Sequence, residues 1–191
     1  MRFIIGLSLL VALPLIPGEA HADSYSDTIA LFRNAGDSAN FFPKSYAYAV
    51  LPTVGEAGFI VGGAHGKGRV YVHDKLVGDT TVTQLSAGFQ AGGKAYSQII
   101  FFEDKRALDE FESGSFEFAA DVSAVAVTAG ASASAGTAGA TSEASGGQKD
   151  ANTKSLGYQK GVAVFTIAKG GLMYSVTVAG QKFTYVPRGG E

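Results

Sequence analysis

Two histidines, His65 and His73, are the side chains best suited to acid–base chemistry or metal binding once the first 22 residues are set aside. With Asp74 or Asp79 they could ligate a metal ion. However, they are eight residues apart, away from the helical i, i+4 spacing, and the chain has no cysteine. It also has no G-x-S-x-G motif to position a serine nucleophile. We therefore expect no metal site, no cofactor and no catalytic residues, and keep a hydrolase that uses His65 or His73 as an alternative.

A glycine-rich segment at 62–68, Gly-Gly-Ala-His-Gly-Lys-Gly, invites comparison with phosphate-binding loops. It departs from the Walker A pattern because no Ser or Thr follows Lys67 and the spacing of its glycines is one residue short. We predict instead a glycine-rich hairpin that joins two strands of a sheet. The alternative is that Lys67 and Arg69 form part of a site for anionic lipid headgroups.

The apolar pair Phe41–Phe42, followed by Pro43 and Lys44, has two interpretations. Either both rings fill the protein core, or they insert among the acyl chains of a membrane while Lys44 meets the headgroups. On the second interpretation the candidate lipid-binding residues of the chain are Phe41, Phe42, Lys44, Lys67 and Arg69.

The composition is that of one compact domain. The chain has 191 residues, of which 46% are hydrophobic, and a net charge of -2. Because the bulk charge is small and negative, we expect no nucleic-acid binding. The lack of cysteine excludes disulfides, a cysteine nucleophile and an acylated lipoprotein cysteine. The sequence indicates no particular protein partner.

Residues 1–22 are predicted to be a signal peptide. Arg2 gives a basic start, residues 3–16 are apolar but too short to span a bilayer, and Ala20-His21-Ala22 fits an Ala-x-Ala cleavage site. An uncleaved membrane anchor is the alternative. We expect a mature chain that begins at Asp23 and is exported, to the periplasm, to the periphery of the cell envelope or out of the cell.

Hydrophobic spacing predicts two helices. Apolar residues at helical intervals indicate the first at 24–40 and the second at 104–113. Asp104 can cap the second helix and Gly114 can end it. Elsewhere the period is two, which is typical of strands, and Ile99–Phe102 is apolar on both faces and so predicts a central, covered strand.

The C-terminal half predicts a loop and further strands. A Gly/Ala/Ser-rich stretch at 136–152 indicates a mobile loop, and residues 162–186 indicate a three-stranded meander. We therefore expect an α+β fold: a mostly antiparallel, strongly bent sheet, either a sandwich or a partly closed barrel, in a single domain at 23–191.

A set of apolar-Pro and glycine-rich segments follows a fixed order along the chain. The segments are Tyr46–Pro52, Gly55–Gly68, Gln90–Ser97, Ile99–Gly114, Gly157-Tyr158 and Gly170–Leu172. Together they resemble the lipid-binding SYLF domain family, and the resemblance covers about residues 28–187. It implies a membrane-associated, non-enzymatic module. Eukaryotic relatives bind phosphoinositides, partly through an N-terminal amphipathic segment, some fungal relatives bind actin, and exported bacterial members resemble envelope lipid-binding proteins.

Two segments depart from the eukaryotic pattern. Residues 24–40 contain a single base, Arg33, and Thr80–Ser86 contains no Trp. We therefore expect contact with phospholipid or glycolipid in general rather than phosphoinositide or actin binding. The predicted function is that of a non-enzymatic envelope or secreted lipid-binding protein, with membrane lipid as its partner. A small outer-membrane β-barrel or structural envelope protein, and the hydrolase named above, are the alternatives.

Overall fold

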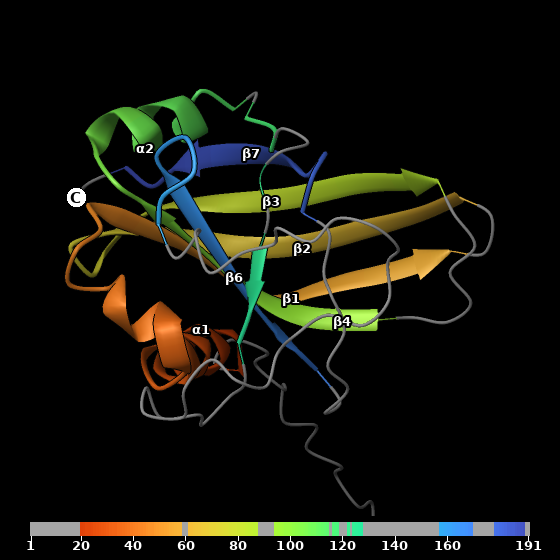
Figure 1. Ribbon diagram of the computed structural model, residues 1–191. Coiled ribbons are helices and arrows are strands. Elements are labelled where there is room, and N and C mark those ends of the chain that lie inside the picture. The colour runs from red at the N-terminus through yellow and green to blue at the C-terminus, as the bar shows by residue number, and fades with distance from the viewer. Residues whose placement is uncertain are drawn as a thin grey trace, which may run out of the picture.

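The computed structural model describes the greater part of the chain, and the statements below concern those residues (Figure 1). They are 20–58, 61–87, 94–114, 116–118, 122, 124–127, 157–169 and 178–189. The predicted loop at 136–152 and the predicted signal peptide up to residue 19 lie outside them. Among the described helices, none has the length and apolarity needed to cross a membrane.

Two helical segments precede the first four strands, and one helix separates these from the last three. In chain order the elements are α1 (Ala20–Arg33), the 3-10 helix η1 (Gly36–Asn40), β1 (Ala47–Gly58), β2 (Val61–Val72), β3 (Lys75–Ala87), β4 (Lys94–Phe102), α2 (Lys105–Glu112), β5 (Ala124–Ala126), β6 (Val162–Ala168) and β7 (Lys182–Pro187).

The strands form one sheet in the order β5-β6-β4-β1-β2-β3-β7. Neighbouring strands are antiparallel except for β5 and β6, which are parallel. The predicted α+β class and the mostly antiparallel sheet are therefore confirmed. The sheet is not closed, since β5 and β7 are its outer strands.

The sheet bends strongly around one of its faces. Gln181, directly before β7, accepts a hydrogen bond of 2.9 Å from Gln98 Nε2 and donates one of 2.8 Å to Tyr96 Oη. Gln98 and Tyr96 belong to β4, which three other strands separate from β7 in the sheet. Direct contact between side chains so far apart in strand order requires the sheet to curl around the space between them.

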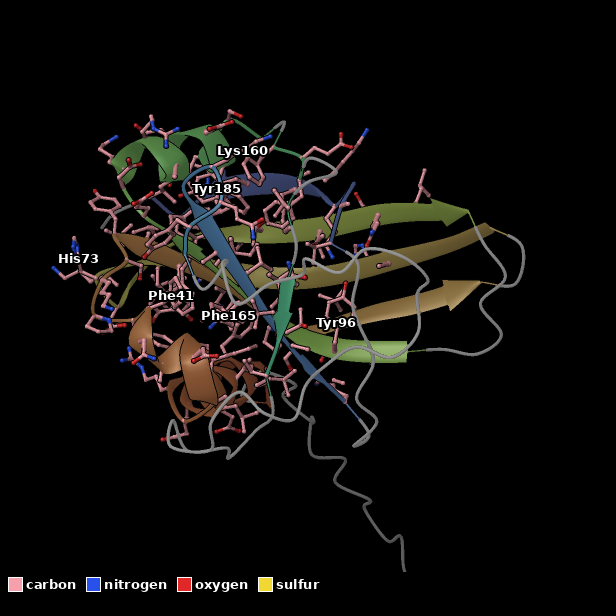
Figure 2. The ribbon with its side chains drawn as sticks, viewed as in Figure 1. Phe41, His73, Tyr96, Lys160, Phe165 and Tyr185 are labelled. Atoms are coloured by element: carbon pink, nitrogen blue, oxygen red, sulfur yellow. The ribbon has the colours of Figure 1, made fainter. Side chains whose placement is uncertain are left out.

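Two apolar clusters lie on opposite faces of the sheet. The first core, on the concave face, contains α2 and the largest share of buried residues: Leu51, Val54, Val70, Val82, Tyr96, Ile100, Phe102, Leu108, Phe111, Phe118, Val164 and Phe183 among others. The second core lies against α1 and η1 and consists of Phe32, Ala35, Phe41, Tyr48, Ile99, Phe101, Ala163, Phe165 and Ile167. Figure 2 shows Phe41 beside Phe165 between the N-terminal helix and the sheet.

β4 is the central, covered strand that its sequence predicts. Ile99 and Phe101 pack in the second core, and Ile100 and Phe102 pack in the first, each with no exposed surface. An unbroken apolar run is what a strand buried on both faces requires.

The helix predicted at 104–113 is also confirmed. Asp104 Oδ1 accepts a hydrogen bond of 2.8 Å from the Ala107 amide and so caps the first turn of α2. Ala107, Leu108 and Phe111 are the buried face of the helix. Gly114 follows with φ +75°, a left-handed conformation that ends helices.

The N-terminal helix differs from its prediction of 24–40. α1 ends at Arg33, and the separate turn η1 covers the last part of the predicted range. The break occurs because Gly36 has φ +43° and because Ser38 Oγ donates to the carbonyl oxygens of Phe32 and Ala35, both at 2.7 Å. These bonds satisfy carbonyl groups that a longer helix would pair with amides.

The glycine-rich segment 62–68 is not a hairpin; this prediction is wrong. It lies within β2, paired with β1 on one side and β3 on the other. The register of β1 shifts between Val50, the partner of Arg69, and Thr53, the partner of Lys67, and so lies opposite Gly68. The glycines of β2 therefore serve close approach of neighbouring strands rather than a turn.

The C-terminal strands are present but do not form the predicted meander. β6 and β7 match the predictions at 162–168 and 182–186, while the predicted strand between them, 172–178, lies outside the described residues. β6 lies between β4 and β5, whereas β7 pairs with β3 at the far side of the sheet. The two strands are thus not neighbours.

A short segment, residues 116–127, reaches both outer parts of the sheet. Phe118 N donates to Gln181 O at 3.0 Å, and Phe183 N donates to Phe116 O at 2.9 Å, so the segment is bonded to β7. Eight residues after Phe116, the same segment enters β5, which pairs with β6. Phe118 and Val122 pack into the first core as the segment passes it.

Candidate functional site

Part of the sheet has a face that no described helix covers. Both helices lie at the same end of the long strands, and β2 and β3 extend well beyond them (Figure 1). Side chains from four paired strands line up on this face, because Thr53, Lys67, Thr81 and Thr184 are successive partners in register. We call it the open sheet face; its residues are Thr53, His65, Lys67, Thr81, Thr83, Leu85, Lys182, Thr184 and Val186.

The open sheet face carries exposed apolar side chains. Leu85 is 88% exposed and Val186 is 63% exposed. They are two of the three large hydrophobic residues that are exposed in the described part of the chain. The third, Leu31, lies on α1. Leu85 and Val186 lie toward opposite ends of the face, because Val186 pairs with Asp79, which is six residues from Leu85 along β3, or about 20 Å in an extended strand.

The charges on and around this face are mainly basic. Lys67 is exposed, and no described residue forms an ion pair with it. Lys169 also reaches the face, where its Nζ donates to Thr53 Oγ1 at 2.7 Å. Lys182 has an acidic neighbour, Glu117, at 3.5 Å. The nearby carboxylate of Asp79 is already bound by arginine, as described next.

Arg69 has a structural position beside the open sheet face. Its guanidinium lies 4.2 Å from the centre of the Tyr25 ring of α1 and 3.9 Å from Asp79. Asp79 is also held by Arg188, with a shortest N–O distance of 2.6 Å. Arg69 is therefore half-buried under α1, while Lys67, two residues before it, is free to meet a ligand.

The two predicted phenylalanines have different environments. Phe41 is only 7% exposed and packs against the rings of Phe101, Tyr158 and Phe165, at centroid distances of 5.0–5.5 Å. Phe41 therefore fills the protein core, which is one of the two interpretations of the Phe41–Phe42 pair. Phe42 is half-buried and borders a surface groove together with Lys44. The five candidate residues thus fall into two groups rather than one site.

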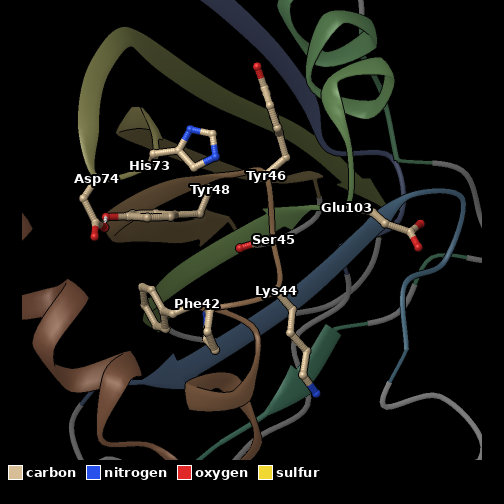
Figure 3. A pocket seen from close by; sticks show the side chains of 9 residues that line it. Phe42, Lys44, Ser45, Tyr46, Tyr48, His73, Asp74 and Glu103 are labelled. Carbon is tan, nitrogen blue, oxygen red and sulfur yellow. Dashed lines mark hydrogen bonds between the residues drawn. The ribbon is translucent and has the colours of Figure 1, made fainter.

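That groove lies where η1 leads into β1. It has a volume of about 530 Å³ and is lined by Phe42, Pro43, Lys44, Ser45, Tyr46, Tyr48, His73, Asp74 and Glu103. Figure 3 shows Asp74 and Glu103 on opposite sides of it, with the ring of Tyr46 directed away from those of Phe42 and Tyr48. The ring of His73 meets Tyr46 edge-on at 5.3 Å.

A tight turn places His73 and Asp74 in the groove. These two residues link β2 to β3, and both have left-handed backbones, with φ +47° and +63°. Positive φ at both positions of a two-residue hairpin fits a type I′ turn. Asp74 Oδ1 accepts hydrogen bonds from Tyr48 Oη and Arg33 Nη2, each 2.7 Å long, which tie the turn to β1 and α1.

His65 and His73 do not share a site. His65 lies on the open sheet face opposite Thr83, and His73 lies at the far end of the same strand. An extended strand rises about 3.3 Å per residue, so eight residues separate them by on the order of 25 Å. Within the described residues, no three His, Cys, Asp or Glu side chains are grouped so as to hold a metal ion.

The family described as "Las17-binding protein actin regulator", Ysc84, matches residues 83–186, more than half of the chain. The chain belongs to the Ysc84 family. This is the SYLF family that the sequence resembles, and the resemblance is confirmed. The Ysc84 match begins within β3 and includes β4, α2, β6 and β7.

A curated relative extends the similarity toward the N-terminus. "Beta cell expansion factor A" of Aeromonas veronii is 28% identical over 157 residues, which cover 81% of this chain and 51% of the relative. The chain therefore spans about half the length of the relative. The groove residues other than Glu103 precede the part that matches the Ysc84 family model.

Several residues of these surfaces were not found by sequence reasoning. Leu85, Val186 and the threonines of the open sheet face carry only the period-two pattern of strands, which assigns a face but not whether that face is covered. Tyr46 and Glu103 line one groove only because β1 and the end of β4 are neighbours in the sheet. The residues around Tyr46 and Glu103 in the sequence carry no signal that β1 pairs with β4.

Tyr48 gives a prediction about alkaline pH. Burial, with the hydrogen bond to Asp74 and the negative charge of that carboxylate, raises the pKa of Tyr48 above its usual value near 10. The folded state thus holds the phenol proton more tightly than the unfolded state, and the resulting stabilisation is complete below pH about 10 and is lost as pH rises further. We expect Tyr48→Phe to be less stable than the wild type by about 1 kcal/mol at neutral pH.

The difference should shrink as pH rises above 10, because only the wild type loses the contribution of the phenol proton. Urea unfolding of both proteins at neutral and alkaline pH measures it. A difference that stays constant over this range would contradict the role given to the Tyr48 proton.

Proposed function

We propose that this protein binds the surface of lipid membranes without catalysing a reaction, and that it does so as an exported protein of the cell envelope or the extracellular space. The observation that carries the proposal is the open sheet face, on which exposed lysines and apolar side chains share one side of the sheet where no described helix covers it. The proposal is also supported by family membership, since the SYLF resemblance implies a membrane-associated module.

The open sheet face suits shallow contact with a bilayer. Leu85 and Val186 are short apolar side chains on a flat surface, so they can enter the boundary between headgroups and acyl chains but not the bilayer centre. Lys67 and Lys169 can meet anionic phosphates, and each base near an anionic surface contributes about 1 kcal/mol. Such binding weakens as salt screens the charges.

Phe42 and Lys44 remain predicted lipid contacts, at the rim of the groove. Phe41 is less suited to insertion, since leaving its place would expose the second core. In this proposal Arg69 does not contact lipid; it stacks on Tyr25 and so holds α1 beside the open sheet face. Lys67 is thus the first residue of the predicted set to test.

Co-sedimentation with vesicles tests the proposal. The probes are vesicles of phosphatidylcholine alone and vesicles that also contain phosphatidylglycerol, each at low and high salt. We expect Lys67→Glu to weaken binding to the anionic vesicles about tenfold or more, because it removes an attraction and adds a repulsion. Lys75→Glu is the matched control. Lys75 is also exposed, but it is the first residue of β3, six residues before Thr81, the partner of Lys67.

A second variant separates the apolar contribution from the charged one. Leu85→Ser should reduce the binding that persists at high salt, with little effect on the salt-sensitive part. The proposal fails if the folded wild-type protein binds neither kind of vesicle, or if Lys67→Glu and Lys75→Glu weaken binding equally.

A further inference from the structure

Two lysines approach Thr53 on the open sheet face from opposite sides. Lys169 directly follows β6, and its backbone amide donates to the carbonyl oxygen of Ala95 at 2.9 Å. Because β4 lies between β6 and β1, the side chain of Lys169 reaches across β4 when its Nζ donates to Thr53 Oγ1 at 2.7 Å. Lys67, in β2, is the partner of Thr53 on the other side. Thr53 therefore lies between two ammonium groups.

The sheet surface beside Thr53 is built from small residues. Gly55, two residues further along β1, pairs with Ala95 on β4 and with His65 on β2. A Cβ atom at Gly55 would meet no atom of the described residues within 4 Å. This part of β1 lies at the end of the sheet away from both helices (Figure 1). A ligand can therefore rest on the backbone of β1 here, with Lys169 on one side and His65 on the other.

The two ammonium groups have no counter-charge in the described part of the chain. Neither Lys67 nor Lys169 forms an ion pair with a described carboxylate, whereas Lys182 on the same face is paired with Glu117 at 3.5 Å. The hydroxyl oxygen of Thr53 accepts from Lys169, so its own proton can be donated to a ligand. Two positive charges with N–H and O–H donors around one spot favour an anion.

The kind of anion follows from the number of charges and donors. A phosphate monoester carries about two negative charges at neutral pH and three acceptor oxygens. It can therefore neutralise both lysines and accept from the threonine hydroxyl as well. A phosphate diester has a single negative charge, so one of the two ammonium groups would keep no counter-charge.

We propose that the surface above Gly55 binds a phosphate monoester of a lipid headgroup. Lys67, Lys169 and the hydroxyl of Thr53 donate to the phosphate oxygens, and His65 adds an N–H donor at the border. Phosphatidic acid is the simplest lipid that ends in this group. The inference rests on the membrane contact proposed for the open sheet face and names the headgroup chemistry that this face prefers.

A lipid is favoured over a soluble ester by an apolar neighbour of the site. Leu85 is 88% exposed and lies two residues beyond Thr83, which is the partner of His65. A phosphate held above β1 thus has an exposed apolar side chain on the same face. Only a lipid brings both an anionic headgroup and an apolar part to such a surface.

The phosphate site can be tested without a membrane by titration of the folded protein with soluble esters. The probes are glycerol phosphate, a monoester, and dimethyl phosphate, a diester, and the amide chemical shifts of Thr53, Gly55 and His65 report binding. We expect saturable shifts with glycerol phosphate and about tenfold weaker binding of dimethyl phosphate, which lacks one charge. Equal binding of the two esters, or no saturable shift with glycerol phosphate, would overturn the proposal.

Variants of the lysines separate a site from general attraction. Lys169→Gln removes a charge but keeps an N–H donor for Thr53. It should weaken glycerol phosphate binding about tenfold, and Lys67→Gln should do the same. Lys182→Gln is the matched control, since it lies on the same face but in β7, where Glu117 already pairs with it. An equal effect of all three would show that the ester has no defined site.

Two variants test the geometry without changing the charge. Gly55→Val places a side chain where the phosphate would rest, and valine suits an exposed strand position, so the fold is kept. It should abolish the saturable shifts. Thr53→Val keeps the shape of threonine without its hydroxyl and should weaken binding about fivefold. Full binding of glycerol phosphate by Gly55→Val would contradict the placement of the ligand.

Vesicles test the lipid source. Vesicles that contain phosphatidic acid are compared with vesicles of equal surface charge that contain phosphatidylglycerol, a diester. We expect tighter binding to phosphatidic acid, and loss of this preference in Gly55→Val. Saturable binding of glycerol phosphate without that preference would overturn the lipid assignment in favour of a soluble ester.

The same data distinguish failure of this inference from failure of the membrane contact. Binding to both kinds of vesicle, with no preference and no shift by glycerol phosphate, would contradict the phosphate site and leave the membrane contact standing. Saturable shifts with glycerol phosphate, but no binding to either kind of vesicle, would contradict the membrane contact and leave a site for a soluble ester.

Discussion

Replacement of Phe101 by alanine is expected to lower the free energy of unfolding by about 3–5 kcal/mol. Phe101 is in the middle of β4 and has no exposed surface. Its ring contacts the rings of Phe41, Phe42 and Phe165 at centroid distances of 5.5, 4.9 and 5.9 Å. Loss of this ring opens a cavity in the second core that the rigid sheet cannot collapse to fill.

The loss should also loosen the N-terminal helix, because α1 and η1 reach the sheet through the second core. Urea unfolding measures the loss of stability, and hydrogen exchange of the α1 amides measures the loosening. Phe101→Leu, which leaves a smaller cavity, should cost less, and Val186→Ala, at an exposed position, should change stability by no more than about 0.5 kcal/mol. A cost for Phe101→Ala within that same range would show that the second core does not stabilise the fold.

Replacement of Gly68 by alanine is the second substitution with a large expected effect. A Cβ atom at this position would lie 2.8 Å from Leu51 Cγ, 2.8 Å from Thr80 Cγ2 and 2.9 Å from the carbonyl oxygen of Val50. The backbone oxygen cannot move without disturbing the pairing of β1 with β2. We expect a loss of about 1–3 kcal/mol, the usual cost of overpacking, measured by urea unfolding.

Gly55→Ala is the matched control. Gly55 lies in the neighbouring strand β1, and a Cβ atom there would meet no atom within 4 Å. It should leave stability unchanged or raise it, since alanine has less freedom to lose on folding. The double substitution Gly68→Ala with Thr80→Ser removes one of the clashes and should recover part of the loss. Equal stability of the two single variants would contradict the close approach of β1 and β2.

The parts of the fold that were predictable are those whose signal is local. Ile99–Phe102 is apolar at every position, which only a strand covered on both faces requires. α2 has its cap at Asp104 and its stop at Gly114 within the same short segment. In each case the residues that decide the structure are near one another in the sequence.

The predictions that were wrong depend on contacts between residues that lie outside the short segment from which each prediction was made. The glycines at 62–68 resemble a turn, but at Gly66 and Gly68 the neighbouring strands leave no room for a Cβ atom, which no window of sequence around them reveals. The helix predicted at 24–40 breaks because Gly36 adopts a left-handed backbone and Ser38 turns back to bond the end of α1. Glycine and serine at these positions weaken a helix without deciding where it ends.

The candidate surfaces were predictable only in part. Lys67 was identified by its charge within a glycine-rich segment that was predicted to be a hairpin, and the structure places it on an exposed face of β2. Phe41 and Phe42 are adjacent and chemically identical, yet the first is in the second core and the second borders the groove. Sequence alone could not separate them, because the difference lies in which way η1 turns the chain.

Association between copies through strand pairing is limited by the segment 116–127. An outer strand with free amides and carbonyls can pair with a strand of another molecule and so begin aggregation. Here the outer side of β7 already bonds to residues 116–118, and β5, on the other side of the sheet, has three described residues, Ala124–Ala126. The described edges of the sheet therefore offer little free backbone to a second copy, which leaves side chains rather than strand pairing as the means by which the open sheet face can make contacts.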